Sequence, residues 1–182
     1  MLSYILAGVV LLIVAFVIVV AKQPSEFRLA RSATMNAPAG AVFAQVNDFH
    51  NWRAWSPWER LDPELKRTYE GAPAGVGAAY SWVGNKKVGA GRMTITESRA
   101  NELIRIKLEF FKPFKAINVT EFVFQPVAQQ TSVTWSMTGT FNVISKIFCV
   151  FMNMDKMVGK NFEEGLANMK SVVEVVRELQ SA

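Results

Sequence analysis

The sequence has very few of the residues from which metal sites and catalytic pairs are built. Its 182 residues include one histidine, His50, and one cysteine, Cys149. A single histidine excludes a histidine-based metal cluster and a pair of histidines acting as acid and base, and a single cysteine excludes an internal disulfide. No cluster of residues has metal-ligand spacing, so no metal and no other cofactor is expected. The lone thiol fits a reducing compartment.

His50 and Cys149 each have an ordinary structural interpretation. Cys149 lies within IFCVF, whose apolar residues favour an inert buried thiol over a nucleophile activated by His50. Asp48 and Asn51, on either side of His50, are residue types that cap helices and shape loops. His50 acting as a general base, oriented by a partner, is the catalytic alternative.

The first 21 residues contain no acidic or basic side chain. MLSYILAGVVLLIVAFVIVVA is apolar throughout, and as a helix rising about 1.5 Å per residue it spans roughly the 30 Å core of a bilayer. Residues 1–21 are therefore predicted to be a transmembrane anchor. A cleaved signal peptide is the alternative, but the charged amino-terminal region is missing and the apolar run is too long.

The net charge of +5 lies entirely after Ala21. Lys22, Arg28 and Arg31 follow the apolar run and no charged side chain precedes it, so the positive-inside rule predicts that the remaining chain is cytoplasmic. A basic domain could attract anionic headgroups, or its charges could simply be solvated. Basic charge with clustered tryptophans is also compatible with stacking on nucleic acid. The basic residues are scattered rather than gathered in a stripe, so no nucleic-acid partner is expected.

After a polar linker at residues 22–25, the pattern indicates one folded domain over residues 26–182. EFRLARSATM alternates like a strand, and PAGAVFAQVNDF repeats apolar residues on one face of a short helix. In FHNWRAWSPWER, Trp52, Trp55 and Trp58 recur every third residue, which predicts a second short helix that Pro57 ends. Such aromatic surface suits either the entrance of a cavity or ordinary packing.

From Leu65 to Phe141 apolar residues recur at every second position, with breaks at glycine- and proline-rich stretches. This predicts about six antiparallel strands with one covered face and one wet face. Glu97 shares the alternation of Met93 and Ile95, so it either points inward with a raised pKa or lies near solvent at a strand end. The side chains predicted to face inward are Tyr80, Trp82, Met93, Ile95, Ile104, Ile106, Leu108, Phe110, Val133, Trp135 and Met137.

A long amphipathic helix is predicted near the carboxyl terminus. In MVGKNFEEGLANMKSVVEVVREL an apolar residue recurs every three or four positions, and this stripe needs a partner that the covered face of the sheet provides. The stripe consists of Val158, Phe162, Leu166, Met169, Val173 and Val176.

This order of elements resembles the helix-grip fold of the START-like superfamily. AVFAQVNDFHNWRAWSPWE, EGAPAGVGAAYSW and NFEEGLANMKSVVE are similar to the SRPBCC group of bacterial polyketide cyclase/dehydrase and lipid-transport proteins, and the likeness covers about Glu26 to Gln180. The resemblance implies an α+β fold in which a curved antiparallel sheet of about seven strands wraps around the long helix. It also implies a hydrophobic cavity between the two, and, with the anchor, a bacterial inner membrane.

The function expected is binding of a hydrophobic small molecule, lipid or isoprenoid-like, by apolar burial in that cavity. Two alternatives are a cyclase/dehydrase-type enzyme in which Tyr80 or His50 moves a proton, and an accessory domain without a ligand. Tyr80 is also a candidate donor to a ligand carbonyl. The predicted ligand contacts are Trp52, Trp55, Tyr80, Trp82, Met93, Ile106, Phe110, Trp135, Met137, Phe162, Leu166 and Met169.

Overall fold

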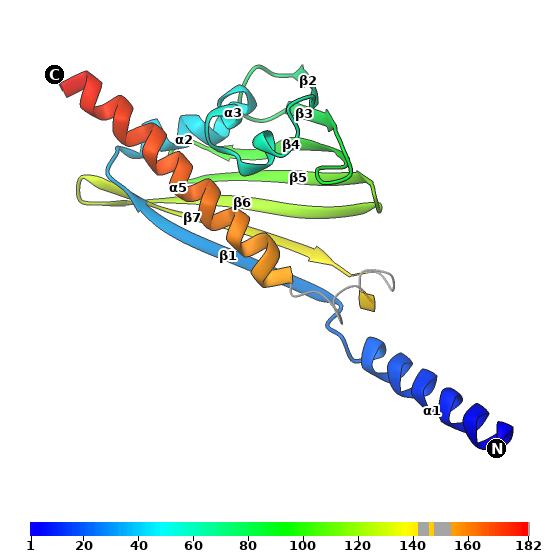
Figure 1. Cartoon of the computed structure of the whole chain (residues 1–182). Coiled ribbons are helices and arrows are strands. Elements are labelled where there is room, and N and C mark those ends of the chain that lie inside the picture. The colour runs from blue at the N-terminus through cyan, green and yellow to red at the C-terminus, as the bar shows by residue number, and fades with distance from the viewer. Residues whose placement is uncertain (142–145, 148–153, 182) are drawn as a thin grey trace.

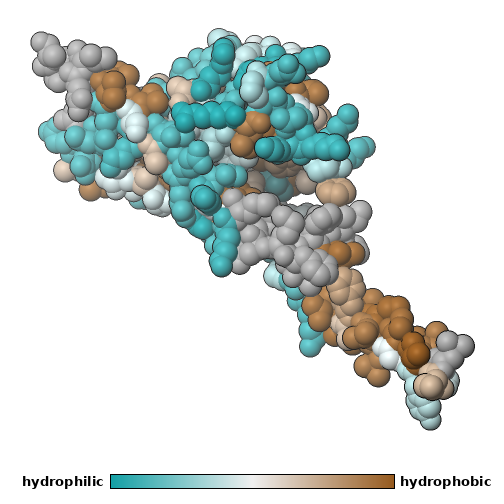
Figure 2. Space-filling model, viewed as in Figure 1, coloured by the Kyte–Doolittle hydropathy of each residue, from teal (hydrophilic) through white to brown (hydrophobic). Residues whose placement is uncertain are grey.

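The computed structural model of the protein describes residues 1–141, 146–147 and 154–181. Helix α1, Leu2–Ala21, extends away from the rest of the molecule, and most of its side chains are exposed (Figures 1 and 2). By length and composition α1 is apolar enough to cross a membrane, criteria that a signal sequence also meets. Four residues separate α1 from the first strand.

A seven-stranded antiparallel sheet forms the body of the protein, which confirms the predicted sheet. Its strand order is β1-β7-β6-β5-β4-β3-β2, so the chain after β1 crosses to the far edge and returns as a meander. The strands are β1 Glu26–Met35, β2 Lys66–Gly71, β3 Ala78–Val83, β4 Ala90–Arg99, β5 Leu103–Lys112, β6 Ala116–Val127 and β7 Gln130–Thr140.

The helices other than α1 lie on one face of the sheet, with the long helix α5 crossing in front of β1 and β7 (Figure 1). Pro57 ends the tryptophan helix α3, as predicted, and also begins a further turn, η2. Cys149 lies outside the described residues. The helices are α2 Ala39–Asn47, η1 Phe49–Asn51, α3 Trp52–Trp55, η2 Pro57–Arg60 and α5 Met154–Ser181.

The stripe predicted on α5 packs against this face for most of its length. Phe162, Leu166, Met169 and Val173 are buried, because α5 lies against β1 and α3. Val176 is 43% exposed, so the packed stripe ends one turn earlier than the spacing indicated.

We call the face of the sheet that α2, α3 and α5 cover the inner face. The alternation along the strands correctly predicts which side chains point to this face at all but two points. Strand β6 supplies Phe122 and Phe124, which the sequence pattern did not single out because their alternates Val119 and Val123 are also apolar. The other point is Glu97, since a register shift after Ile95 places it opposite Arg105. Glu97 forms ion pairs with Arg105 and Arg99, so it faces solvent rather than the core.

Candidate ligand-binding site

The centre of the inner face is a packed aromatic cluster. Trp135 on β7 stacks on Phe162 of α5, with ring centroids 4.0 Å apart. Phe122, directly opposite Trp135 on the neighbouring strand β6, also stacks on the indole, with ring centroids 4.8 Å apart. The indole N–H of Trp135 donates to Thr120 Oγ1 at 3.0 Å, so its polar atom has a partner inside the apolar core. This part of the face is occupied by the protein's own side chains.

The tryptophans of FHNWRAWSPWER extend this cluster. Trp52 and Trp55 are buried with rings 4.6 Å apart, and their N–H groups donate to the carbonyls of Val46 and Gln45 at 3.1 Å. Trp58 is half-buried and meets Trp135 edge-on at 5.7 Å. Trp52 and Trp55 therefore pack in the core. Their role as ligand contacts stays a prediction.

The inward side chains of β5 become more exposed toward the end of the strand. Ile104 and Ile106 are fully buried, whereas Leu108 and Phe110, the next inward residues, are only partly buried. Trp82 of β3 is also partly buried and meets Phe110 edge-on at 5.9 Å. Figure 2 shows hydrophobic surface recessed beneath a hydrophilic rim on the viewed face. The apolar inner surface thus continues beyond the packed core toward one end of the sheet.

The other predicted contacts also share this face. Tyr80, Met93, Ile106 and Met137 are buried in the same cluster as Trp135, and from α5 come Leu166 and Met169. Ten of the twelve predicted ligand contacts therefore lie in one core, and Trp82 packs against it. Phe110 meets Trp82 edge-on, in the partly exposed part of the same face.

A polar network borders the inner face where η2 meets β2 and β3. The Tyr80 hydroxyl donates to Glu59 Oε1 at 2.6 Å, and Arg67 Nε donates to Glu59 Oε2 at 2.6 Å. The Glu59 side chain is only 8% exposed, so both donors are needed to compensate the loss of water around its charge. Burial, together with the hydrogen bond to Glu59, holds the pKa of Tyr80 far above its ordinary value.

This network changes the role expected for Tyr80. Its proton is held by Glu59 rather than presented to a ligand carbonyl, and its raised pKa makes the hydroxyl a weak acid that stays protonated at neutral pH. Sequence reasoning missed Glu59 altogether, because no spacing rule connects it with a tyrosine 21 residues later. The only local signal was a carboxylate directly after the tryptophan turn.

Tyr69 lies beside this network, because it pairs with Tyr80 across β2 and β3 and their rings are 5.3 Å apart. Asp48 Oδ1 accepts hydrogen bonds from the His50 backbone N–H at 2.8 Å and pairs with its Nδ1 at 2.7 Å, which confirms Asp48 as a helix cap. The exposed imidazole stacks on Tyr69 at 4.0 Å. The buried Tyr69 hydroxyl has no hydrogen-bond partner among the described residues, and burial raises its pKa.

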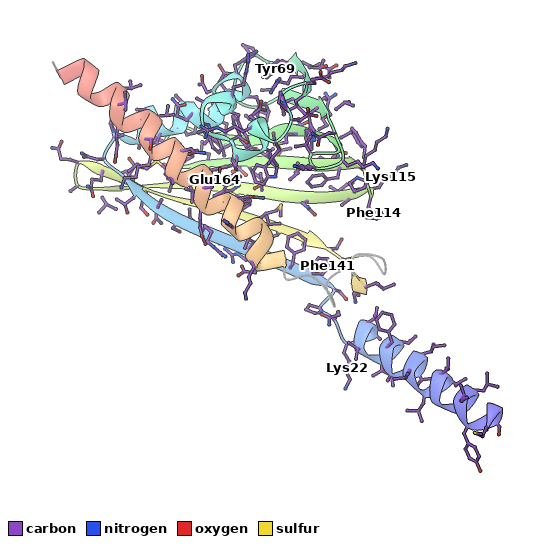
Figure 3. The ribbon with its side chains drawn as sticks, viewed as in Figure 1. Lys22, Tyr69, Phe114, Lys115, Phe141 and Glu164 are labelled. Carbon is purple, nitrogen blue, oxygen red and sulfur yellow. The ribbon has the colours of Figure 1, made fainter. Side chains whose placement is uncertain are left out.

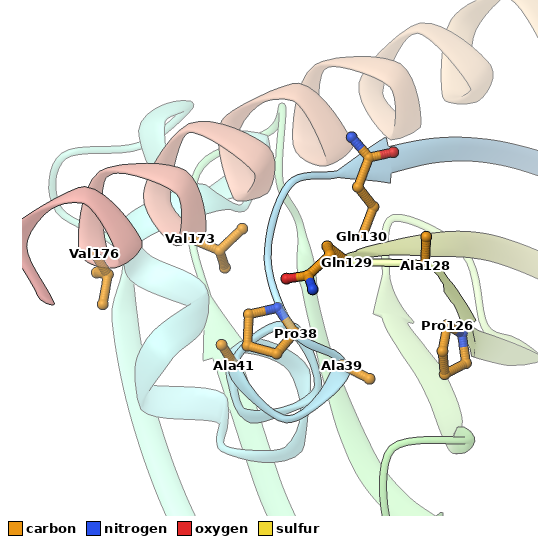
Figure 4. A pocket seen from close by; sticks show the side chains of 9 residues that line it. All are labelled: Pro38, Ala39, Ala41, Pro126, Ala128, Gln129, Gln130, Val173 and Val176. Carbon is orange, nitrogen blue, oxygen red and sulfur yellow. The ribbon is translucent and has the colours of Figure 1, made fainter. Parts of the chain in front are cut away.

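An open pocket of about 550 Å³ lies at the other end of the sheet, where β6 turns into β7 (Figure 4). Val173 and Val176 of α5 form one side, and Pro38 and Ala41 at the start of α2 form the other, with Gln129 between them. Its lining carries no titratable side chain, and none of the predicted ligand contacts belongs to it. Within the described part of the chain, no three His, Cys, Asp or Glu residues form a group suited to a metal.

A family model described as polyketide cyclase/dehydrase and lipid transport matches residues 26–174. The chain belongs to this family. The matched region begins with β1 and ends within α5, so it contains the whole inner face and leaves α1 outside. None of the curated proteins matches the chain.

Solved structures show the same fold at low sequence identity. The di-domain ARO/CYC protein BexL from the BE-7585A biosynthetic pathway aligns with TM-score 0.62 and 16% identity, over 87% of this chain and 53% of that one. Protein CV1439 from Chromobacterium violaceum aligns with TM-score 0.56 and 16% identity, over 84% and 99%. SA2116 from Staphylococcus aureus, of unknown function, aligns with TM-score 0.59 and 13% identity, over 84% and 96%. The last two alignments span nearly the whole of the solved chain.

Proposed function

We propose that the protein binds a hydrophobic small molecule, lipid or isoprenoid-like, on the inner face of the sheet beside α5, and that α1 anchors it in a membrane. The observation that carries this proposal is the gradient along β5, from buried Ile104 and Ile106 to partly buried Leu108 and Phe110. Apolar surface that continues past a packed core is a natural site for an apolar ligand.

The ligand enters at the partly exposed end of the inner face, where Trp82 and Phe110 are its first contacts. Deeper residues such as Trp135 and Phe162 contact each other at 4.0 Å, so they meet the ligand only if these rings separate. The family comprises both cyclase/dehydrase and lipid-transport proteins, and BexL belongs to a biosynthetic pathway. The family description and the pathway of BexL are each compatible with a largely apolar ligand.

A cyclase/dehydrase-type enzyme is the second candidate, and the Tyr80–Glu59–Arg67 network favours it. A phenol hydrogen-bonded to a buried carboxylate is a place where a proton can be held beside the inner face. In that case Tyr80→Phe abolishes turnover while the ligand still binds. For a pure binding protein, Tyr80→Phe changes stability and nothing else.

Residues 1–21 serve as the anchor in this proposal, residues 22–25 as the linker and residues 26–182 as the binding domain. The basic residues directly after α1 support a cytoplasmic location of the domain at a bacterial inner membrane. A reporter fused after Ala182 that is active only outside the cytoplasm tests this orientation, and its activity would overturn it.

Thermal unfolding of the segment from Lys22 to Ala182 against a panel of lipids and isoprenoids tests ligand binding. A ligand that binds only the native state adds about 2.7 kcal/mol to the free energy of unfolding at a hundredfold excess over Kd. At least one compound is expected to stabilise the domain, and native mass spectrometry of the full-length protein is expected to show a co-purified apolar molecule. A flat panel together with an empty mass spectrum would favour the ligand-free accessory domain.

A further inference from the structure

The connection between β5 and β6 lies at the same end of the sheet as the linker from α1. Glu26, the first residue of β1, pairs with Thr140, and the ladders continue through Asn118↔Gly139 to Phe110↔Ala116. Figure 3 shows Phe114 and Lys115 at the end of the sheet where Phe141 and Lys22 also lie. We call residues 111–117, FKPFKAI, the β5–β6 tip.

The β5–β6 tip exposes three large apolar side chains. Phe111, Phe114 and Ile117 are 50%, 47% and 60% exposed. Phe111 and Ile117 belong to the outward-facing positions of neighbouring strands, on the side opposite Phe110, so they contribute nothing to the inner face. An exposed apolar cluster of this kind on a small domain marks a surface that contacts a partner or a membrane.

The tip and the neighbouring β3–β4 connection carry charge of one sign, and Glu109, the carboxylate opposite Ile117, forms an ion pair with Lys107. Lys112 and Lys115 are exposed within it, and Lys86 and Lys87 are exposed in the β3–β4 connection. The two connections are in contact, because a Cβ added to Gly89 would lie 2.3 Å from the carbonyl oxygen of Lys112. Residues 84–90 and 110–118 contain four lysines and no carboxylate. Apolar side chains surrounded by lysines match the interface of a bilayer that carries anionic headgroups.

The short linker keeps this end of the sheet close to the end of α1. Four fully extended residues span at most about 14 Å, so the start of β1, at the same end of the sheet as the tip, stays within that distance of α1. We propose that the β5–β6 tip is a second membrane contact, in which Phe111, Phe114 and Ile117 enter the interface of an anionic bilayer beside the four lysines. The proposal rests on α1 being a membrane anchor.

The proposed membrane contact of the β5–β6 tip also provides a route for the ligand between the membrane and the inner face. Leu108 and Phe110, on the partly exposed part of the inner face, lie next to the tip on the same strand. With the tip in the bilayer interface, this opening faces the membrane, and an apolar molecule passes between the two without crossing bulk water.

Site-directed spin labelling of the full-length protein in vesicles tests the contact. A single label is placed at Ile117 after Cys149→Ser, which removes the only native cysteine. Its matched control is a label at Val127, on the same face of the same strand, 51% exposed and about 33 Å away at the far end. A third label, at Val14, reports on α1. Accessibility is measured as collision with oxygen, which concentrates in lipid, and with a water-soluble nickel chelate.

In vesicles of phosphatidylcholine and phosphatidylglycerol, the oxygen-to-nickel ratio at Ile117 is expected to exceed that at Val127 severalfold. Replacing Lys86, Lys87, Lys112 and Lys115 with glutamine is expected to lower it, as is removing phosphatidylglycerol. A ratio at Ile117 equal to that at Val127, with Val14 in lipid, would overturn the second contact alone. Low access to both collision partners at Ile117 would indicate a protein partner and also overturn it. An aqueous Val14 would instead overturn the anchor, and the second contact with it.

Discussion

The indole of Trp135 and the phenyl ring of Phe162 lie face to face, with centroids 4.0 Å apart and planes inclined by only 9°. This contact joins β7 to α5. Gly165, one turn further along α5, keeps the approach open, because a Cβ there would lie 2.8 Å from Trp135 Cζ3. The position of α5 on the sheet, and therefore the extent of inner face that it covers, depends on these side chains.

Phe162→Ala is expected to lower the free energy of unfolding by about 3 to 5 kcal/mol, because it removes a fully buried ring and leaves a cavity. Urea unfolding followed by far-ultraviolet circular dichroism measures the loss. Val176→Ala, on the same helix but 43% exposed, is the control and should change stability by about 0.5 kcal/mol or less. Equal effects of the two variants would contradict the packing described for α5.

Tyr80→Phe is expected to lower the free energy of unfolding by about 1.5 to 3 kcal/mol, since it removes a hydrogen bond to a charged and buried carboxylate. Tyr69→Phe provides a matched control. The Tyr69 hydroxyl is buried with no hydrogen-bond partner among the described residues, so its loss should be neutral or slightly stabilising. A larger loss for Tyr69→Phe than for Tyr80→Phe would show that the network has been assigned to the wrong tyrosine.

The raised pKa values of Tyr80 and Tyr69 predict a loss of stability in alkali. Below about pH 10, the ordinary tyrosine pKa, the two tyrosines are protonated in both the folded and the unfolded chain, so their contribution to the free energy of unfolding is fully present. Above it the unfolded chain loses these protons while the folded chain keeps them, so the free energy of unfolding falls as the pH rises. Denaturation at a series of alkaline pH values, with tyrosinate absorbance as a second signal, measures this. Ionisation of Tyr80 without unfolding, near the ordinary pKa, would contradict its burial.

Phe110→Asp and Phe111→Asp form a matched pair that distinguishes a specific loss of ligand binding from a general loss of stability. Both residues lie near the end of β5, but Phe110 faces inward and Phe111 faces outward. In the segment from Lys22 to Ala182, Phe110→Asp should abolish the thermal stabilisation by an apolar ligand, because it places a charge where the ligand is desolvated. Phe111→Asp should retain it. Equal ligand responses would place the binding site elsewhere.

Alkaline carbonate extraction is expected to leave the full-length protein in the membrane pellet and to release the segment from Lys22 to Ala182. The physical reason is the uncharged length of α1, which is sufficient to span the hydrocarbon core. A mature protein whose amino terminus is Lys22, detected by intact mass, would identify α1 as a signal sequence and exclude the anchor.

Much of the fold was predictable because its signals are local. Glycine- and proline-rich stretches separated the strands of the meander, and the alternation along β3, β5 and β7 identified the side chains that face inward, most of which the structure buries. Strand β6 was harder, because polar Asn118 and Thr120 occupy inward positions while Ile117 and Val119 face outward. Glu97 was ambiguous because a one-residue register shift reverses the face of every later side chain.

By itself the sequence determined the apolar helix α1, the antiparallel sheet with one covered face, and the long helix that covers it, since hydrophobic periodicity and chain breakers act over a few residues. Only the tertiary structure decided which surfaces meet. The tertiary structure paired Glu59 with Tyr80 and Arg67 and stacked Trp135 on Phe162. It also placed the β5–β6 tip at the end of the sheet near α1 (Figure 3). These relationships join residues far apart in the chain, and they depend on strand order and register, which no local pattern specifies.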